Sequence, residues 1–249
     1  MENSSLNHTE NHKTEEKETK RTPIKQRKKE NEVLRFIREH IRYFAAGALG
    51  GVLILVLALC AKPKGSDSDV VVNANATEST QATEEAYQVD AYESINTLIT
   101  QYYTAYAAGD ITTLSSIATP ISANEQSYIG LFSQYVDEYQ NIKCYTKTGL
   151  DANSYLVSVS MEIKFTGVDT TAPGLDFFYV RTNDDGTLYI DNLYSQYNLA
   201  NQENALDTSV QSLIGQFESE SDVVELQSEV QTRYDEALAA DENLANMIQ

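Results

Sequence analysis

The segment from Tyr43 to Ala61 constrains the rest of the chain most, because its nineteen residues include no charged side chain. At ~1.5 Å of rise per residue, a helix of this length spans roughly 28 Å, about the hydrocarbon thickness of a bilayer. An isolated apolar segment can cross lipid only as a helix, since it must satisfy its own backbone donors and acceptors. Residues 43–61 are therefore predicted to form one transmembrane helix in contact with membrane lipid.

The distribution of basic residues predicts the orientation of this helix. Residues 1–42 hold eleven Lys and Arg, seven of them within residues 25–42, whereas only Lys62 and Lys64 lie close on the other side. Lys and Arg within about 20 residues of a span favour the cytoplasmic side. We expect a single-pass protein of the cell membrane with a cytoplasmic N-terminus and an extracellular C-terminal region.

Two kinds of N-terminal processing compete with an uncleaved anchor. The charged leader of 42 residues is long for a cleaved signal peptide, and no small-x-small site follows the apolar core. Lipoprotein processing favours a small residue before Cys60, where this chain has Leu59. We expect an uncleaved signal anchor, and the lipidation of Cys60 stays open.

Charge and residue types exclude several functions for the extracellular region. It carries 29 acidic and 7 basic side chains, so it repels nucleic acid and anionic lipid surfaces. All three histidines precede the predicted span, and Cys144 is the one cysteine that follows it. Without histidine this region cannot form a Ser-His-Asp site, a Cys-His site or a His-ligated zinc centre. We expect no nucleic-acid partner, no metal and no cofactor.

Composition divides the chain around the span. The predicted parts are a disordered basic cytoplasmic tail (1–42), the transmembrane helix (43–61), a flexible extracellular linker (62–86), a folded domain (87–197) and a C-terminal helical extension (198–249). The basic cluster in residues 25–29 is either simply solvated or attracted to anionic headgroups of the inner leaflet.

Three helices are predicted at the start of the folded domain. Apolar residues within 95–106 recur at i, i+3, i+4 and i+7, which indicates a helix with one face on a core. Gly109 suits the left-handed C-terminal cap of this helix, and Asp110 suits the N-cap of a short second helix that ends before Pro120. A third helix is predicted over residues 124–140.

The apolar period then changes from 3.6 to 2. Residues 154–165 alternate between apolar and polar, which predicts a long strand with one buried and one solvent-exposed face. Further strands are predicted over residues 142–148, 175–182 and 187–193. The segment Asn183–Gly186 contains the Asp-Gly pair of a hairpin turn and lacks the ligand pattern of a calcium loop. Helices followed by an antiparallel meander predict an α+β domain.

The stretch from Tyr106 to Pro120 resembles a local pattern of the NTF2-like superfamily. After the aromatic residue come Gly109-Asp110 and then Leu114 and Ile117, followed by a further helix and antiparallel strands. The resemblance covers residues 90–197. It implies a cone, in which a bent sheet wraps around helices and leaves a cavity at its open end.

The order of tail, span, linker and such a domain resembles that of uncharacterised membrane proteins of Gram-positive bacteria. It is more loosely similar to the conjugation component TcpC and to the N-terminal non-catalytic domains of some penicillin-binding proteins.

Residues 198–249 are predicted to form a pair of helices. Apolar residues between Leu206 and Phe217 make one face, residues 219–222 interrupt the pattern, and a second face begins at Val223. We favour packing of this pair on the sheet or on the cone mouth. The alternative is a docking helix or a dimer seam of a homo-oligomer.

NTF2-like enzymes place an Asp base and a Tyr or a protonated acid inside the cone, as the resemblance implies. Here Tyr179 or Tyr189 with Asp176 or Asp191 would suit that chemistry, but the spacing favours no pair. Asp176 and Tyr179 also fall on opposite faces of a strand. Because tyrosine supplies large amphipathic contact area without any chemistry, we assign no catalytic residue.

The leading hypothesis is a non-catalytic binding or scaffolding module on a linker that lets it reach a protein partner of the cell envelope. The alternatives are a sensor that binds a small ligand in the cone and an isomerase- or cyclase-like enzyme with a Tyr/Asp site. A cone filled by its own side chains would count against both alternatives. A broad exposed apolar patch would favour the scaffold.

Overall fold

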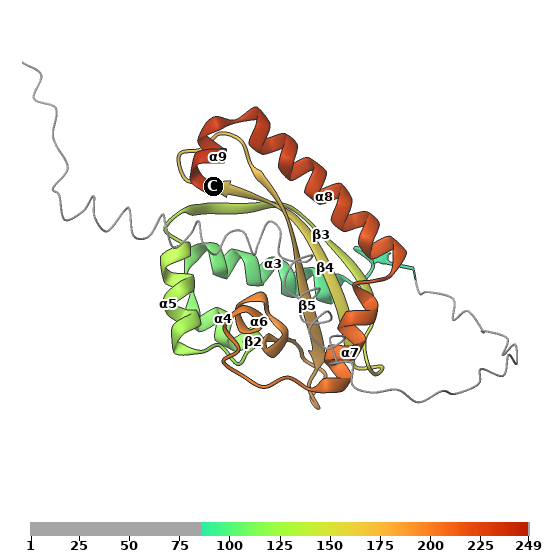
Figure 1. Cartoon of the computed structure of the whole chain (residues 1–249). Coiled ribbons are helices and arrows are strands. Elements are labelled where there is room, and N and C mark those ends of the chain that lie inside the picture. The colour runs from blue at the N-terminus through green and yellow to red at the C-terminus, as the bar shows by residue number, and fades with distance from the viewer. Residues whose placement is uncertain (1–85, 249) are drawn as a thin grey trace, which may run out of the picture.

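The computed structural model describes residues 86–248. They form a six-stranded open sheet with helices on both faces, which is an α+β arrangement (Figure 1). Within this range no helix is both long and apolar enough to cross a membrane. The predicted span at residues 43–61, the basic tail and residues 62–85 of the predicted linker lie outside the described residues.

Three helices precede the long strands. They are α3 (Glu93–Ala108), α4 (Ile111–Ile117) and α5 (Ala123–Phe132). α3 ends at Gly109, whose φ of 64° is left-handed, a conformation that strains residues with a Cβ. The Asp110 side chain accepts a hydrogen bond from the Thr113 N–H at 3.1 Å and so caps α4. The predicted boundary between the first two helices is confirmed.

The helix predicted over residues 124–140 is wrong in its second half. α5 ends at Phe132, and β3 (Val136–Thr148) begins four residues later. Val136 lies opposite Phe165 at the far end of β4 (Ser154–Phe165). The apolar residues after Phe132 fit a helical period, but β-branched and aromatic residues also suit a strand, and pairing with β4 decides between the two.

All strands within residues 86–248 belong to one sheet with the order β1-β3-β4-β5-β6-β2. The strands not yet given are β1 (Gln88–Val89), β2 (Ala118–Thr119), β5 (Ala172–Thr182) and β6 (Leu188–Asp191). Neighbours are antiparallel except for the parallel pair β2 and β6. In the predicted hairpin between β5 and β6, Gly186 has a φ of 85° and the Asn183 N–H donates to the Thr187 carbonyl at 2.9 Å. Apart from the ends of some strands, the predicted meander is confirmed.

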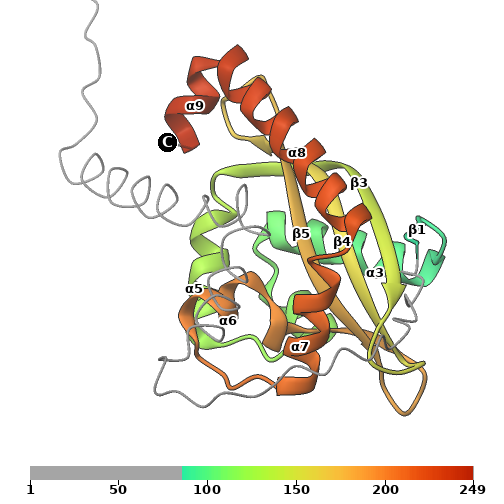
Figure 2. The ribbon, with the colours of Figure 1, turned by 45° about the vertical axis from the view of Figure 1, so that its right-hand side comes forward.

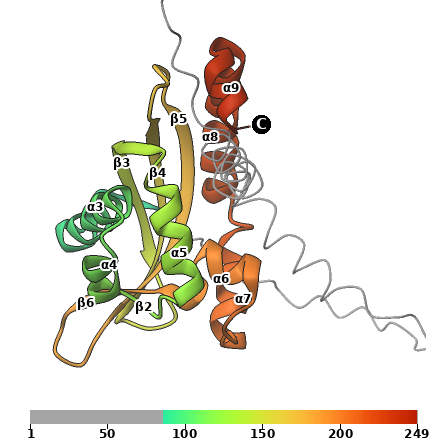
Figure 3. The ribbon, with the colours of Figure 1, turned by 90° about the vertical axis from the view of Figure 1, so that its left-hand side faces the viewer.

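Helices cover both faces of the sheet (Figure 3). α3 packs against β3 on the face that we name inner, and α7 and α8 lie on the opposite, outer face, where α8 runs along β5 (Figure 2). The elements after β6 are η1 (Asn192–Tyr194), α6 (Gln196–Asn201), α7 (Thr208–Phe217), α8 (Ser221–Ala240) and α9 (Glu242–Ile248). The favoured packing of the C-terminal helices on the sheet is confirmed, although they number more than the predicted pair.

β4 is buried on both faces, so its predicted solvent-exposed face is wrong. Val157 packs in the inner core, whereas Leu156 packs with Phe217 of α7 in the outer core. The polar side of the strand is also covered, because Ser158 is 4% and Ser160 is 7% exposed. The apolar-polar alternation of β4 predicts a solvent-exposed face. It contains no information on α7 and α8, which follow about 50 residues later and cover that face.

Candidate functional site

A buried carboxylate lies on the inner face of the sheet. Asp176 of β5 is 9% exposed; its Oδ1 accepts a hydrogen bond from the Phe177 N–H at 2.8 Å, and its Oδ2 accepts one from the Tyr103 hydroxyl at 3.4 Å. Burial raises the pKa of Asp176 to about 6, and the two hydrogen bonds offset only part of this effect. A carboxyl group with such a pKa can exchange a proton near neutral pH, as acid–base sites require.

Aromatic side chains fill the space around Asp176. The ring centroid of Phe178 lies 5.0 Å from that of Tyr102 and 5.8 Å from that of Tyr103. Tyr103 in turn lies 4.6 Å from Tyr139 of β3. Three surface hollows found among the described residues are lined by residues other than Asp176 and Tyr103. Asp176 is therefore part of a packed aromatic core.

The structure separates Asp176 from Tyr179, whereas the register of β5 and β6 puts Tyr179, Tyr189 and Asp191 on one face near Arg181. Tyr179 points to the outer face, where its ring centroid lies 5.3 Å from that of Tyr194. Asp176 instead meets Tyr103, which comes from α3, 73 residues earlier in the chain. No local spacing could have indicated this pair, because only the packing of α3 on the sheet creates it.

The second suggested acid, Asp191, is buried at the end of β6 and pairs with the largely exposed Arg181. Its carboxylate lies 3.5 Å from the Arg181 guanidinium and accepts the Leu193 N–H at 3.4 Å at the start of η1. Tyr189 lies opposite Arg181 in the ladder of β5 and β6. Burial raises the pKa of Asp191, against the lowering effects of the Leu193 hydrogen bond and Arg181. This group fastens the end of the sheet to η1.

Sequence reasoning missed another buried carboxylate, Glu125 of α5. Its two oxygens accept hydrogen bonds from the Asn192 side-chain amide at 3.0 and 2.9 Å. The same amide donates to the Pro120 carbonyl at 2.8 Å. Burial raises the pKa of Glu125 to about 7, although the Asn192 hydrogen bond lowers it. The arrangement ties α5 and the segment after β2 to η1.

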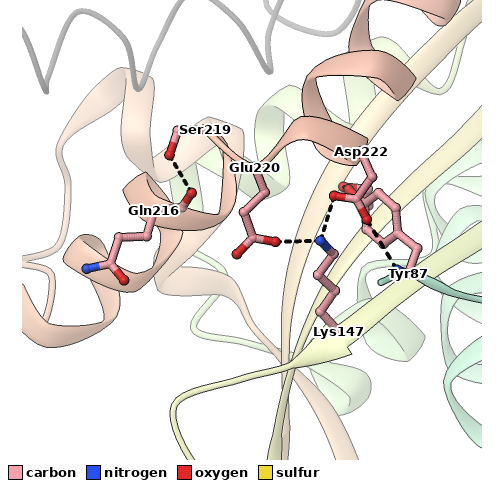
Figure 4. Close-up of polar contacts among 7 residues, drawn as sticks. Tyr87, Lys147, Gln216, Ser219, Glu220 and Asp222 are labelled. Atoms are coloured by element: carbon pink, nitrogen blue, oxygen red, sulfur yellow. Dashed lines mark hydrogen bonds and ion pairs between the residues drawn. The ribbon is translucent and has the colours of Figure 1, made fainter. Parts of the chain in front are cut away.

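On the outer face, a buried lysine joins three parts of the chain (Figure 4). The Lys147 ammonium on β3 donates hydrogen bonds to Glu220 and to Asp222, the latter at 2.6 Å, and its side chain is 2% exposed. Asp222 also accepts the Tyr87 N–H at 3.2 Å, and the Lys147 nitrogen lies 4.7 Å from the centre of the Tyr87 ring. We name Tyr87, Lys147, Glu220 and Asp222 the lysine cluster.

The lysine cluster is suited to fastening rather than to nucleophilic chemistry. Burial lowers the pKa of Lys147, but the hydrogen bonds to Asp222 and Glu220 and the charges of these groups raise it more. The nitrogen therefore stays protonated and has no free electron pair for attack on a carbonyl. The cluster holds the first described residues, β3 and the start of α8 together.

The exposed side of α3 lies between two hollows. One hollow of about 630 Å³ extends toward α4, and another of about 840 Å³ extends toward the hairpin between β5 and β6. Glu93, Thr97 and Gln101 line both. The second also contains Tyr92 and Tyr155, whose ring centroids are 5.5 Å apart. We name the surface made by α3 and these two hollows the α3 face.

The α3 face carries little charge although the domain is strongly acidic. Glu93 and Asp110 are the charged residues in the lining of the two hollows, whereas residues 86–248 contain 24 acidic and 5 basic side chains. Residues 86–248 expose four large apolar side chains, and these do not form one cluster in the sequence. They are Val89, Tyr92, Leu150 and Val224. The α3 face is therefore a sparsely charged surface of mixed polar and apolar side chains, and the large exposed apolar residues do not gather into one broad patch on it.

No protein-family model, no curated protein and no solved structure matches this chain. Within residues 86–248, no group of three or more His, Cys, Asp or Glu side chains is placed to hold a metal ion. The function must therefore be inferred from the geometry of the chain itself.

Proposed function

We propose that the chain is a membrane-anchored binding or scaffolding module that presents an NTF2-like domain outside the cell to a protein of the envelope. The observation that carries this proposal is the α3 face, a nearly uncharged surface with two hollows on an acidic domain. The anchor in this proposal is the apolar segment at residues 43–61.

The order and packing of the elements support the NTF2-like part of the proposal. Three helices precede four consecutive antiparallel strands, and the first of these helices packs on the inner face of the sheet. The Gly109-Asp110 turn that carries the resemblance ends α3 and caps α4.

The surface chemistry of the α3 face favours a protein partner. The centres of protein interfaces are depleted of charged residues and enriched in aromatic ones, whereas the interface as a whole is about as apolar as the remaining surface. The α3 face has this character, with Tyr92 beside the second hollow. The C-terminal helices offer less to a partner, because Val210, Ile214 and Phe217 are buried against the sheet.

The packed interior counts against the sensor and the enzyme. A ligand in the cone would need the volume that the rings of Tyr102, Tyr103 and Phe178 occupy. Asp176 has a raised pKa beside a tyrosine, but substrate access to it would require these rings to move.

Site-specific photo-cross-linking in intact cells tests the proposal. A photoreactive residue is placed in the full-length protein at Thr100, which is exposed and lines the first hollow. The matched control position is Glu225, which is exposed on α8 on the opposite side of the sheet. We expect one envelope protein to be captured from Thr100 and not from Glu225. Thr104→Arg in the same protein should abolish this capture, because it puts a charge into the face.

Two results would contradict the proposal. Equal capture from both positions would show that contacts are nonspecific. Recovery of the chain alone, with or without Thr104→Arg, would remove the scaffold and direct attention to small ligands. A full-length protein that lacks residues 87–249 defines the background.

A further inference from the structure

We infer that the outer side of the sheet holds a binding site for a small zwitterion, either a free amino acid or a short peptide, in a hollow between α8 and the irregular part of β3. The site uses neither α3 nor the hollows beside it, so it is independent of the proposed partner-binding face.

α8 is fastened to the sheet by charged contacts at two points. In its first turn, Asp222 binds Lys147 of β3. Eleven residues later, Arg233 binds Glu162 of β4 at 2.6 Å, a separation of about 16 Å along a helix. Between these points Leu226 packs in an apolar cluster with Leu175 of β5. α8 is thus attached to the sheet by two charged contacts and by the apolar contact between them.

The hollow beside α8 has the size of a small-molecule site. Its volume is about 440 Å³, within the roughly 300–1,000 Å³ typical of such sites. Its lining comes from three parts of the chain, namely the end of the β1 segment at Asp90, the strands β3 and β4, and α8. The residues used below are Asp90, Asn141, Lys143, Glu162, Glu229 and Arg233.

The backbone is irregular at this hollow. The β3–β4 ladder has a register shift between Gln140 and Lys143, and Asn141 has a φ of 52°. Asp90, which follows β1 and accepts a hydrogen bond from the Cys144 N–H at 2.8 Å, has a φ of 50°. Two of the three non-glycine residues with positive φ within residues 86–248 therefore line one hollow. Asn and Asp adopt this left-handed conformation more readily than other residues with a Cβ, and β-bulges are over-represented next to functional sites.

One cation and one anion face this hollow without a partner. Within residues 86–248, neither Lys143 nor Glu229 forms an ion pair or a side-chain hydrogen bond. Lys143 belongs to β3 and Glu229 belongs to α8, and both line the hollow. A ligand with both charges can bind each of them, with its carboxylate at Lys143 and its ammonium at Glu229.

The neighbouring charges disfavour ligands with a single charge. A simple anion would meet the carboxylates of Asp90, Glu162 and Glu229, and a simple cation would meet Lys143 and Arg233. The acids of the described residues are not grouped closely enough to hold a metal ion. A zwitterion is the class of ligand whose charges match both signs.

Calorimetric titration of the full-length protein in detergent micelles tests this site, with trialanine as the first probe. Matched probes are N-acetyl-trialanine, which lacks the ammonium, and trialanine amide, which lacks the carboxylate. We expect trialanine to bind with a Kd near or below about 1 mM and each capped peptide to bind at least roughly tenfold more weakly. Equal binding of all three, or no binding of trialanine up to about 10 mM, would overturn the site.

Variants of the two unpaired residues connect binding to the hollow. Lys143→Met and Glu229→Gln should each weaken trialanine binding at least roughly tenfold. Glu225→Gln, on the same helix but outside the hollow, should leave it unchanged. Unaltered binding in both site variants would overturn the proposal, as would equal loss in Glu225→Gln.

A titration with free alanine separates the two sources of the ligand. Binding as tight as that of trialanine indicates an amino-acid site, and binding weaker by tenfold or more indicates a peptide site. The amount of partner captured by photo-cross-linking from Thr100 should be the same in wild type and in Lys143→Met. The titrations therefore test the hollow beside α8, and the cross-linking tests the α3 face separately.

Discussion

A buried ionisable side chain on the inner face of the sheet and one on the outer face are satisfied differently. On the inner face, Asp176 has a neutral phenol at 3.4 Å and a backbone N–H as hydrogen-bond donors. On the outer face, Lys147 has two carboxylates, and the cluster also contains the Tyr87 ring. The buried acid thus lacks an opposite charge, whereas the buried base has two.

This difference determines which charge state folding favours. Without a cation, burial favours the neutral form of Asp176 and raises its pKa to about 6. With two anions, Lys147 remains charged, since their effect on its pKa exceeds that of burial. We therefore expect the stability of the inner face to change between about pH 4 and pH 6 and that of the outer face to respond to the loss of a charged partner.

The largest effect should follow from Lys147→Met. The change leaves Glu220 and Asp222 without their cation, and these carboxylates are 26% and 33% exposed. Breaking a buried ion pair destabilises by ~3–5 kcal/mol, and partial exposure places this case near the lower value. Chemical denaturation of the full chain in detergent, followed by tyrosine near-UV circular dichroism, measures the loss.

A triple variant is the control for this prediction. Lys147→Met with Glu220→Gln and Asp222→Asn removes all three charges and keeps an acceptor for the Tyr87 N–H. It should recover most of the lost stability, because no unpaired charge remains. A triple variant as unstable as Lys147→Met would mean that packing, not charge, dominates the outer cluster.

The next effect concerns Asp176→Asn and its dependence on pH. In the wild type the pKa of this carboxyl rises from an ordinary value near 3.8 to about 6 on folding. The folded state then binds more protons than the unfolded state between these values, so stability falls as pH rises from about 4 to about 6 and is constant above. The corresponding difference is roughly 2–3 kcal/mol.

The asparagine variant cannot lose this proton. Relative to wild type, its free energy of unfolding should therefore increase by roughly 2–3 kcal/mol between about pH 4 and pH 6. Denaturation curves at several pH values test this relation. The comparison with wild type cancels the contribution of Glu125, whose pKa is also raised. A constant difference across this range would show that Asp176 is ionised in the folded core.

Local signals in the sequence were sufficient for the boundary between α3 and α4 and for the turn between β5 and β6, but not for either buried charge. Gly109-Asp110 and the turn at residues 183–186 act through their own backbone, so a short stretch reveals them. Tyr103 is 73 residues from Asp176, and Lys147 is 75 residues from Asp222. Such contacts depend on which helices cover which face, and the period of a single strand does not contain that information.

The end of α5 shows a second reason for failure. Residues 135–139 include apolar side chains at spacings that fit both a helix and a strand. The choice is made by β4, whose Phe165 lies opposite Val136. A local pattern that suits two structures is decided by its neighbour in the sheet.

A smaller effect is expected for Tyr103→Phe on the inner face. The variant removes the hydroxyl that donates to Asp176 and keeps the ring in the aromatic core. Because the hydrogen bond is long at 3.4 Å, its loss should destabilise by about 0.5–1 kcal/mol at neutral pH. At pH 4, where the carboxyl is protonated, the loss should be smaller. A larger loss at pH 4 than at pH 7 would contradict donation to the carboxylate.

The smallest effect should follow from Arg233→Gln, at the other charged contact of α8. Its guanidinium is 2.6 Å from Glu162, but the two side chains are 41% and 21% exposed. Water solvates both charges after the change, so the loss should be about 0.5 kcal/mol and should decrease further at high salt. Lys147→Met should retain its larger loss in the same salt series, because burial shields the lysine cluster from added ions. If the two variants respond equally to salt, then exposure does not explain why Lys147→Met loses more stability than Arg233→Gln. The difference in stability loss would then come from the side chains packed around each ion pair, which for Lys147 include the Tyr87 and Phe217 rings.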